Sequence, residues 1–229
     1  MSILQVMKDL PVYPASKDDP LKRYVNKEIE DYPSPMDPPP LYTAPTIQVP
    51  YDQMVQTLKD LIDDHNDFEK VLNVFDQALV SFKEKGWKFD SEISAAFKKF
   101  FQYMDDDLIL HTRKEEKALF PCLQEKLLES GEHSPGPHLM TPVDIMESDH
   151  ERVSVMTNLV FNLLGLAARI RDDEARNLLF EHAFHQGQEI VEVMKLHIYK
   201  ENTTVFPLAQ QLLSAQDWEN IVSKIGRLS

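Results

Sequence analysis

Hydrophobic residues recur at alternating spacings of three and four along residues 58–82, which predicts one buried face of an amphipathic helix. Residues 86–90 then read as a turn. The same spacing resumes over residues 93–122, so a second helix is expected to run back beside the first, to about residue 129. The inward positions expected of these two helices are Leu58, Leu61, His65, Phe68, Leu72, Phe75, Leu79, Phe82, Ile93, Phe97, Phe100, Met104, Leu108, His111, Glu115, Ala118 and Cys122.

Two further helices are predicted after a loop at residues 130–141. Thr141, followed by Pro142 and by Asp144, is typical of a capped helix start, and Asp172-Asp173 separates the third helix from the fourth. A short final helix is expected after Ser214-Ala215-Gln216-Asp217. The inward positions expected here are Met146, His150, Val153, Thr157, Val160, Leu164, Ala167, Leu179, Ala183, Gln186, Ile190, Val193, His197, Glu201, Val205, Leu208 and Leu212.

The predicted fold is therefore all-α: an up-down antiparallel four-helix bundle over residues 50–229, with the short helix at its C-terminus. Residues 1–49 are predicted to form a separate proline-rich arm, because ten of the fifteen prolines lie in residues 1–50. The arm is expected to be extended, with at most one short helix at residues 21–29. Pro121 and Pro207 are predicted to kink the second and fourth helices at matching heights.

A repeated pattern of histidine and glutamate carries the candidate chemistry. His111 and Glu115 are four residues apart, and so are His197 and Glu201; a lone histidine precedes each pair, His65 by 46 residues and His150 by 47. The flanks repeat as well. A lysine precedes each glutamate, and the sequences Leu-Phe-Pro and Val-Phe-Pro follow at residues 119–121 and 205–207.

These six side chains are expected to meet inside the bundle. Positions four apart share one helix face, and the midpoints of the two histidine separations, residues 88 and 173.5, fall on the two predicted turns. Each pair of histidines therefore lies level across an antiparallel helix pair. Mixed imidazole and carboxylate ligands suit Fe, Mn or Zn, and burying so many titratable groups without a metal ion would be costly.

Composition excludes several classes of protein. The formal net charge of −14 disfavours nucleic acid and anionic membrane surfaces as partners. Cys122 is the only cysteine, so neither a disulfide framework nor a thiolate metal cage is possible within the chain. No apolar run is long enough to span a membrane and no leader peptide is recognisable, so a cytoplasmic protein is predicted.

Residues 50–213 resemble the hemerythrin-like (HHE cation-binding) family. The resemblance rests on His65, on the segment 111–115 (His-Thr-Arg-Lys-Glu), on Asp149-His150-Glu151 and on the segment 197–201 (His-Ile-Tyr-Lys-Glu). It implies a four-helix bundle around a non-haem di-iron centre with an oxide or hydroxide bridge. It also implies that His65 and His111 serve one iron, that His150 and His197 serve the other, and that Glu115 and Glu201 bridge them.

The chain departs from the oxygen-carrying hemerythrins in two ways. Those proteins have a fifth histidine in an H-x-x-x-H motif, whereas Met146 and Ser154 occupy the positions four before and four after His150. They also have an aspartate where this chain has Glu201. Stable reversible carriage of O₂ is therefore not expected, and the ligand set is closer to di-iron proteins of nitrosative-stress response and iron-centre repair. The latter usually add a cysteine-containing N-terminal domain, and residues 1–49 contain no cysteine.

Other polar residues are expected to lie outside the centre. His182 and His185 point away from the ligand direction, although His185 and Glu189 form a third pair four residues apart. Exposure to solvent is predicted for His133 and His138, and inert packing for Cys122. Glu116 could replace Glu115 only where the helix is distorted. Tyr103 and Tyr199 are candidate hydrogen-bond donors near the centre.

The predicted function is a di-iron protein that binds or reacts with O₂, NO or peroxide in oxidative or nitrosative stress or in iron-centre repair. Such a reaction could require an electron donor, which the sequence does not identify, and whether the protein is an enzyme is left open. Two alternatives remain. One is a module that senses or handles iron and whose folding depends on the metal, and the other is a helical interaction scaffold without metal.

Overall fold

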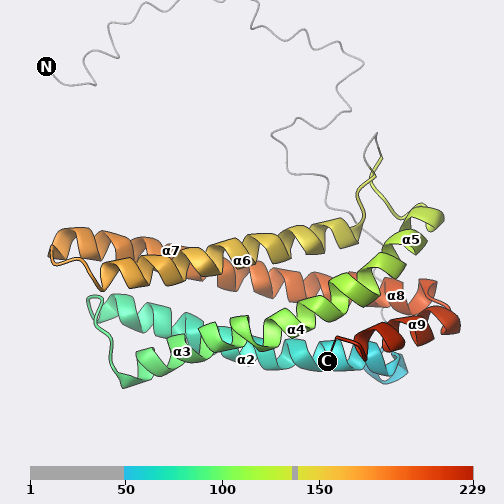
Figure 1. Cartoon of the computed structure of the whole chain (residues 1–229), viewed down its shortest axis with the longest axis horizontal. Helices are drawn as coiled ribbons and strands as arrows, with labels where there is room; N and C mark the ends of the chain where they lie inside the picture. Colours follow the sequence, from blue (N-terminus) through green and yellow to red (C-terminus); the bar gives the residue numbers. More distant parts are fainter. Residues whose placement is uncertain (1–48, 136–138, 229) are drawn as a thin grey trace, which may run out of the picture. The chain divides into compact units, whose positions relative to one another are not determined.

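A computed structural model of the chain describes residues 49–135 and 139–228. Within these ranges all regular secondary structure is helical, and no strand occurs (Figure 1). The predicted arm and His138 lie outside the described residues. The elements are η2 (Tyr51–Gln53), α2 (Gln56–Glu84), α3 (Ser91–Asp105), α4 (Asp107–Lys114), η3 (Glu115–Leu119), α5 (Phe120–Ser130), α6 (Pro142–Ala167), α7 (Asp173–Lys200), η4 (Glu201–Val205), α8 (Phe206–Leu212) and α9 (Ala215–Ile225).

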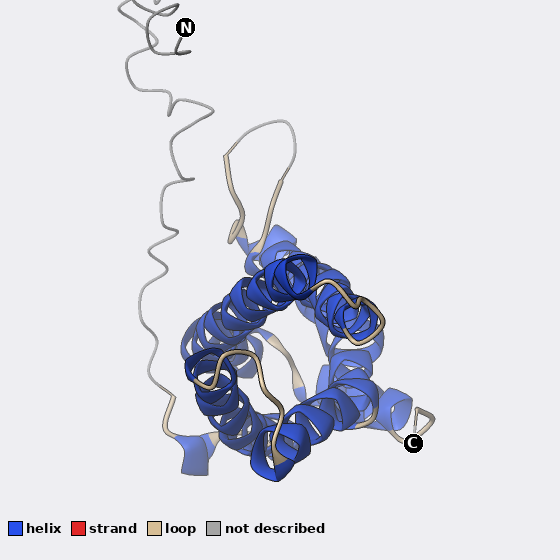
Figure 2. Cartoon of the chain, turned by 90° about the vertical axis from the view of Figure 1, so that its left-hand side faces the viewer, coloured by secondary structure: helices blue, strands red, loops and turns tan. Residues whose placement is uncertain are grey.

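The long helices form the predicted up-down bundle. α2 packs against α3 and α7, and α6 packs against α7. The turns between α2 and α3 and between α6 and α7 lie at one end of the bundle, and α5, α8 and α9 lie at the other (Figure 1). Seen along the bundle axis, the helices surround a common interior (Figure 2).

The helix starts follow the predicted capping signals. The backbone N–H of Thr141 donates to Asp144 Oδ2 at 2.7 Å, and Pro142 is the first residue of α6. Asp172 caps α7 by accepting from the Ala175 N–H at 2.8 Å. These side chains satisfy backbone donors that the first helical turn leaves without intrahelical partners.

The apolar interior consists of two separate clusters. One fills the end near the α2–α3 and α6–α7 turns, where the rings of Phe75 and Phe100 stack with centroids 3.8 Å apart. The other fills the opposite end and includes Leu58, Leu123 and Phe206. Along every long helix, the predicted histidines and glutamates lie between residues of the first cluster and residues of the second. The bundle therefore encloses a polar layer between two apolar cores.

The second predicted helix is not continuous, which corrects the prediction of one helix from residue 93 to about residue 129. Asp106, with φ −102° and ψ −68°, separates α3 from α4. Leu108 is consequently only half-buried. A run of three aspartates at residues 105–107 occurs at this break, and aspartate is a poor helix former away from an N-terminus.

Wide π-helical turns precede both internal prolines, where kinks were predicted. In η3 the backbone N–H of Phe120 donates to the carbonyl of Glu115, and in η4 that of Phe206 donates to Glu201. Proline has no N–H, and its ring clashes with the carbonyl four residues earlier. A wider turn removes this conflict ahead of Pro121 and Pro207. Turns of this kind occur frequently at functional sites.

No helix in the described ranges combines the length and the apolar composition that a membrane span requires.

Candidate metal centre

The structure brings all six predicted side chains into the polar layer between the two cores. Each long helix supplies one histidine, and each π-helical turn begins with one glutamate. Five of the six residues are buried outright, and the side chain of His150 is 7% exposed. The contributors are His65 on α2, His111 on α4, Glu115 on η3, His150 on α6, His197 on α7 and Glu201 on η4.

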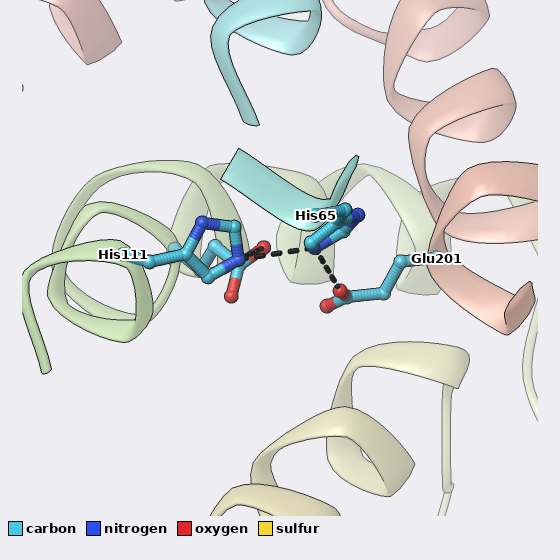
Figure 3. A group of neighbouring side chains, drawn as sticks. His65, His111 and Glu201 are labelled. Atoms are coloured by element: carbon cyan, nitrogen blue, oxygen red, sulfur yellow. Dashed lines mark hydrogen bonds and ion pairs between the residues drawn. The ribbon is translucent and has the colours of Figure 1, made fainter. Parts of the chain in front are cut away.

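One half of the cluster is built around His65 and His111. Their Nε2 atoms are 3.1 Å apart. Nε2 of His111 is 3.2 Å from Glu115 Oε1, and Nε2 of His65 is 3.1 Å from Glu201 Oε2. Figure 3 shows His65 between the His111 ring and the Glu201 carboxylate. Ligand atoms of these four residues all lie within 4.8 Å of one another.

The other half is built around His150 and His197, whose Nε2 atoms are 3.2 Å apart. Nε2 of His197 is 3.2 Å from Glu201 Oε2, and Nε2 of His150 is 3.5 Å from Glu115 Oε2. Ligand atoms of His150, His197 and Glu201 also lie within 4.8 Å of one another. Each glutamate therefore contacts one histidine from each half of the cluster.

These spacings match those of ligands around a metal ion. Two nitrogens about 2.1 Å from one ion and at right angles are about 3.0 Å apart. The Nε2 atoms within each histidine pair have close to this separation. In neutral histidines whose Nδ1 atoms carry the protons, two facing Nε2 atoms would have no hydrogen between them, so a cation between them is the natural partner.

The glutamates provide the clearest test of whether a cation fits. Glu115 and Glu201 are fully buried, and apart from the contacts with the cluster histidines at 3.1–3.5 Å their four carboxylate oxygens have no hydrogen-bond partner among the described residues. A buried carboxylate without compensation is strongly destabilising. Hard and borderline cations take oxygen and imidazole ligands of this kind. The residues present therefore fit a metal centre.

Charged residues outside the cluster hold the histidine rings in place. Asp64 Oδ2 accepts from His111 Nδ1 at 3.3 Å and from Lys114 Nζ at 2.8 Å. In the other half, Asp149 Oδ2 is 3.7 Å from His197 Nδ1 and accepts from Lys200 Nζ at 3.4 Å. The distance of 3.7 Å between Asp149 and His197 is too long for a direct hydrogen bond. The arrangement of aspartate, histidine and lysine is nevertheless the same in both halves.

The remaining two histidines have different outer partners. His65 Nδ1 is 2.9 Å from Asn202 Oδ1, whereas His150 Nδ1 is 3.0 Å from Glu116 Oε1. An acceptor at Nδ1 places the ring proton there and leaves the Nε2 lone pair directed at the interior. The two halves thus share one ligand geometry but differ by one negative charge in their surroundings.

Electrostatics within the cluster favour positive charge. Burial lowers the pKa of His111, but the charge of Glu115 and the contact with Asp64 outweigh burial and raise this pKa to about 10. His197 behaves in the same way: burial lowers its pKa, and Glu201 and Asp149 raise it to about 10.

The carboxylates show the complementary effect. Burial raises the pKa of Glu201, but the neighbouring His197 and His65 hold it well below its usual range. Burial also raises the pKa of Asp64, and hydrogen bonds from His111 and Lys114 outweigh this and lower it to about 2. The cluster therefore attracts protons in place of a metal ion, and metal binding would displace them.

Several other sequence predictions can be compared with the structure. His182 and His185 are exposed, and Glu189 pairs with Arg152 instead of His185. His133 is half-buried, which corrects the prediction that it is solvent-exposed, and its Nδ1 lies 3.0 Å from its neighbour's carbonyl.

The tyrosine predictions divide. The Tyr103 hydroxyl donates to the backbone carbonyl of Asp64 at 3.2 Å, and Asp64 directly precedes His65 in the chain. Tyr199 is 65% exposed and was wrongly predicted to approach the centre. Glu116 does not replace Glu115, although the helix is distorted, because it contacts the outer nitrogen of His150.

The sequence reasoning missed the outer partners Asp64, Glu116 and Asn202. One signal was present in the sequence. An aspartate directly precedes each lone histidine, as Asp64-His65 and Asp149-His150, and this repeat parallels the Lys-Glu repeat. Glu116 and Asn202 occupy equivalent positions, each directly after a cluster glutamate. Because one is an acid and the other an amide, the sequence repeat did not mark them as outer partners.

Fold and site together define a class: a four-helix bundle protein whose interior holds a histidine and carboxylate cluster that could hold a metal. The family described as "Hemerythrin HHE cation binding domain" matches residues 56–209. This match covers more than half of the chain and contains all six cluster residues. The chain belongs to this family.

Curated proteins with detectable similarity include several described as "Iron-sulfur cluster repair protein YtfE". The protein from Cronobacter sakazakii is 23% identical over 111 residues, which are 48% of this chain and 45% of that protein. Those from Escherichia coli and Escherichia fergusonii are 22% identical over 111 residues, 48% of this chain and 46% of theirs. The chain thus spans less than half the length of these relatives. No solved structure matches it.

Proposed function

We propose that this protein holds two iron ions in its interior and that this di-iron centre binds or reacts with O₂, NO or hydrogen peroxide. His65 and His111 would hold one ion, His150 and His197 the other, and Glu115 and Glu201 would span both. The observation that carries the proposal is the position of the two glutamates. Each lies within 3.5 Å of one histidine from each half, and none of the four oxygens has another partner among the described residues.

When bound, the ions would supply Lewis acidity and one-electron redox chemistry that no side chain of the cluster can supply. The surrounding residues orient the histidine rings and limit the access of water. Asp64, Glu116 and Asn202 fix the outer ring nitrogens, so that the inner nitrogens face the interior. The two apolar cores on either side of the layer keep bulk water from reaching it along the bundle axis.

A role in stress response or in repair of iron centres is part of the same proposal. It is supported by the relatives described as iron-sulfur cluster repair proteins. The aligned part is less than half of those proteins, so a repair activity of the whole relative does not transfer directly. Four histidines with two glutamates, without a fifth histidine at Ser154, support a reactive centre over an oxygen store.

The second candidate is a module whose folding depends on the metal, as an iron sensor or iron-handling protein would need. It is favoured by the position of the cluster between the two cores. The two buried carboxylates must be neutralised for the helices to pack closely there, so ion binding and bundle stability are linked.

Metal analysis of protein purified without chelator tests the proposal. We expect about two equivalents of iron and loss of most of it in a variant carrying both His111→Ala and His197→Ala. The variant His182→Ala plus His185→Ala is the matched control, because these histidines are exposed on α7 and should leave the metal content unchanged. Less than one equivalent of any transition metal, unaffected by the first variant, would overturn both candidates.

Spectroscopy then separates the two candidates. A reactive centre should show near-ultraviolet charge-transfer bands that change when the reduced protein meets O₂ or NO. A sensing module should instead lose much of its circular dichroism helix signal when iron is removed with a chelator. Bands that do not respond to either gas, together with this loss of helix, would favour the second candidate over the first.

A further inference from the structure

A cavity of about 590 Å³ lies between the α3–α4 segment and α6. It occurs where the bundle is least tightly closed, since α6 packs chiefly on α7, and α3 packs on α2. Its rim carries Ile109 and Val155, apolar side chains that are 44% and 68% exposed. The cavity is therefore open to solvent.

The floor of this cavity reaches the metal centre from one side. His150 and Glu116 both line it, and Glu116 contacts the outer nitrogen of His150. On the other side of the centre, beside His65 and His111, the structure leaves a void of only about 10 Å³. The larger cavity thus gives a molecule of more than a few atoms an approach to the centre on the His150 side.

The size of the cavity exceeds what a diatomic ligand needs. One water molecule occupies about 30 Å³ in the liquid, whereas sites for organic ligands typically range from about 300 to 1,000 Å³. The buried part of the wall is mainly apolar and includes Met104, Val153 and Met194. Size and lining together fit an organic molecule with an apolar body.

One polar group in the lining can recognise the head of such a molecule. Glu116 offers a carboxylate oxygen beside His150, at the end of the cavity that meets the centre. A head group that donates a hydrogen bond, such as a hydroxyl or hydroperoxide, satisfies this acceptor.

Charge excludes an anionic ligand. The lining contains the acidic residues Asp105, Glu116 and Glu151 and one basic residue, Arg113. The chain as a whole carries a formal charge of −14. A carboxylate head would meet repulsion from Glu116 in a partly desolvated site, whereas a neutral hydroxyl would not.

We propose that this cavity binds a neutral amphiphile, an apolar organic molecule with a hydroxyl or hydroperoxide head, next to the His150 side of the centre. The inference rests on the proposed function only in treating His150 as part of a metal centre. It extends the ligand class from O₂, NO and hydrogen peroxide to organic hydroperoxides and alcohols.

Calorimetric titration of the metal-containing protein with cumyl alcohol, a stable neutral probe with an apolar ring and one hydroxyl, tests the inference. The matched anion is 2-methyl-2-phenylpropanoate, which has a carboxylate in place of the hydroxyl. We expect the alcohol to bind and the anion to bind at least about tenfold more weakly. Equal binding of both probes, or no binding of the alcohol, would overturn the proposal.

Variants locate the binding. Glu116→Gln keeps the side-chain shape and removes the charge, so the alcohol and the anion should bind with more similar affinities. Ser154→Phe, from an exposed position of α6 that lines the cavity, should occupy part of it and weaken binding. Ser94→Phe, at an exposed position of α3 that is not among the cavity residues, is its control and should bind as the original protein does. Unchanged binding in Ser154→Phe would overturn the inference.

Metal content, measured on the same samples, keeps the two proposals apart. Protein that contains iron but does not bind the alcohol contradicts the cavity proposal alone. Protein that binds the alcohol with the expected variant pattern but contains no transition metal contradicts the proposed function alone.

Discussion

In the metal-free protein, the buried histidines should make stability fall as pH rises above neutrality. The pKa of His111 and of His197 is about 10 in the folded protein, above the ordinary value of 6.5. Their stabilising contribution is therefore fully present below pH 6.5 and is lost as pH rises through about 10. Over this window the folded state holds one more proton per histidine than the unfolded state does.

The size of the effect follows from counting these protons. Each proton held only by the folded state lowers the free energy of unfolding by about 1.4 kcal/mol per pH unit. Two such histidines give a slope of about −2.7 kcal/mol per pH unit between pH 7.5 and 9. Few single domains have enough stability to tolerate this over several units, so the metal-free protein should unfold in mildly alkaline buffer.

Glu201→Gln tests the cause. Glu201 is the largest of the influences that raise the pKa of His197, so the variant should lose the contribution of that histidine and about half of the slope. Glu192→Gln makes the same change at an exposed position of α7 and should keep the full slope.

Urea unfolding followed by circular dichroism, in chelator and at half-unit steps of pH, measures the slope. The comparison between the two variants cancels the lysines and tyrosines that titrate above pH 9, because both variants contain them. A slope near zero in the original protein, or equal slopes in Glu201→Gln and Glu192→Gln, would refute the reasoning. Added metal should remove most of the pH dependence of the free energy of unfolding, because it displaces the protons from both histidines.

Three further predictions concern the outer partners and the core. Asp64→Asn should weaken metal binding about 10- to 100-fold, as other substitutions of a partner that accepts from a ligand histidine do, while His185→Ala should leave the affinity in a competitive chelator titration unchanged. Phe75→Ala should lower the free energy of unfolding by about 3–5 kcal/mol in a urea titration, because this fully buried ring stacks in the larger core. Gly187→Ala should cost about 1–3 kcal/mol in the same assay, since its Cβ would lie 2.9 Å from a methyl carbon of Leu79; an unchanged midpoint would show that the leucine shifts freely.

The bundle and the six cluster residues could be predicted from sequence because they obey one rule. The helix repeat places residues three and four apart on one face, and His65, His111, His150 and His197 occupy that face with the apolar residues. The family match confirms the fold class. The contacts at 3.1 and 3.2 Å within the two histidine pairs agree with the levels expected from the turns.

Beyond each glutamate the same rule succeeds only in part. Ala118, Val205 and Leu208 were predicted inward and are buried. The pattern placed Cys122 and Leu212 inside, but both are half-buried, and the next residues, Leu123 and Leu213, are buried instead. Each lies after a π-helical turn. One extra residue in a turn rotates all later positions around the helix axis. A spacing of three and four assumes an uninterrupted α-helix, so it places later residues such as Cys122 and Leu212 on the wrong face. A proline six residues after the glutamate, as at Pro121 and Pro207, is the signal for it.

The inner residues of the centre are the same in both halves, whereas the residues around them differ in part. The ligands repeat from one half to the other, as do the aspartate, histidine and lysine sets and the π-helical turns, so the repeat in sequence determines the inner geometry. Where the repeat fails, at Glu116 against Asn202, the surroundings differ as well: the larger cavity opens beside His150, and only a small void lies beside His65. The two histidine pairs therefore have equal inner contacts but differ in the charge around them and in their access from solvent. The difference in charge and the difference in space fall on the same half, so the His150 side is where a bound molecule and the centre would meet.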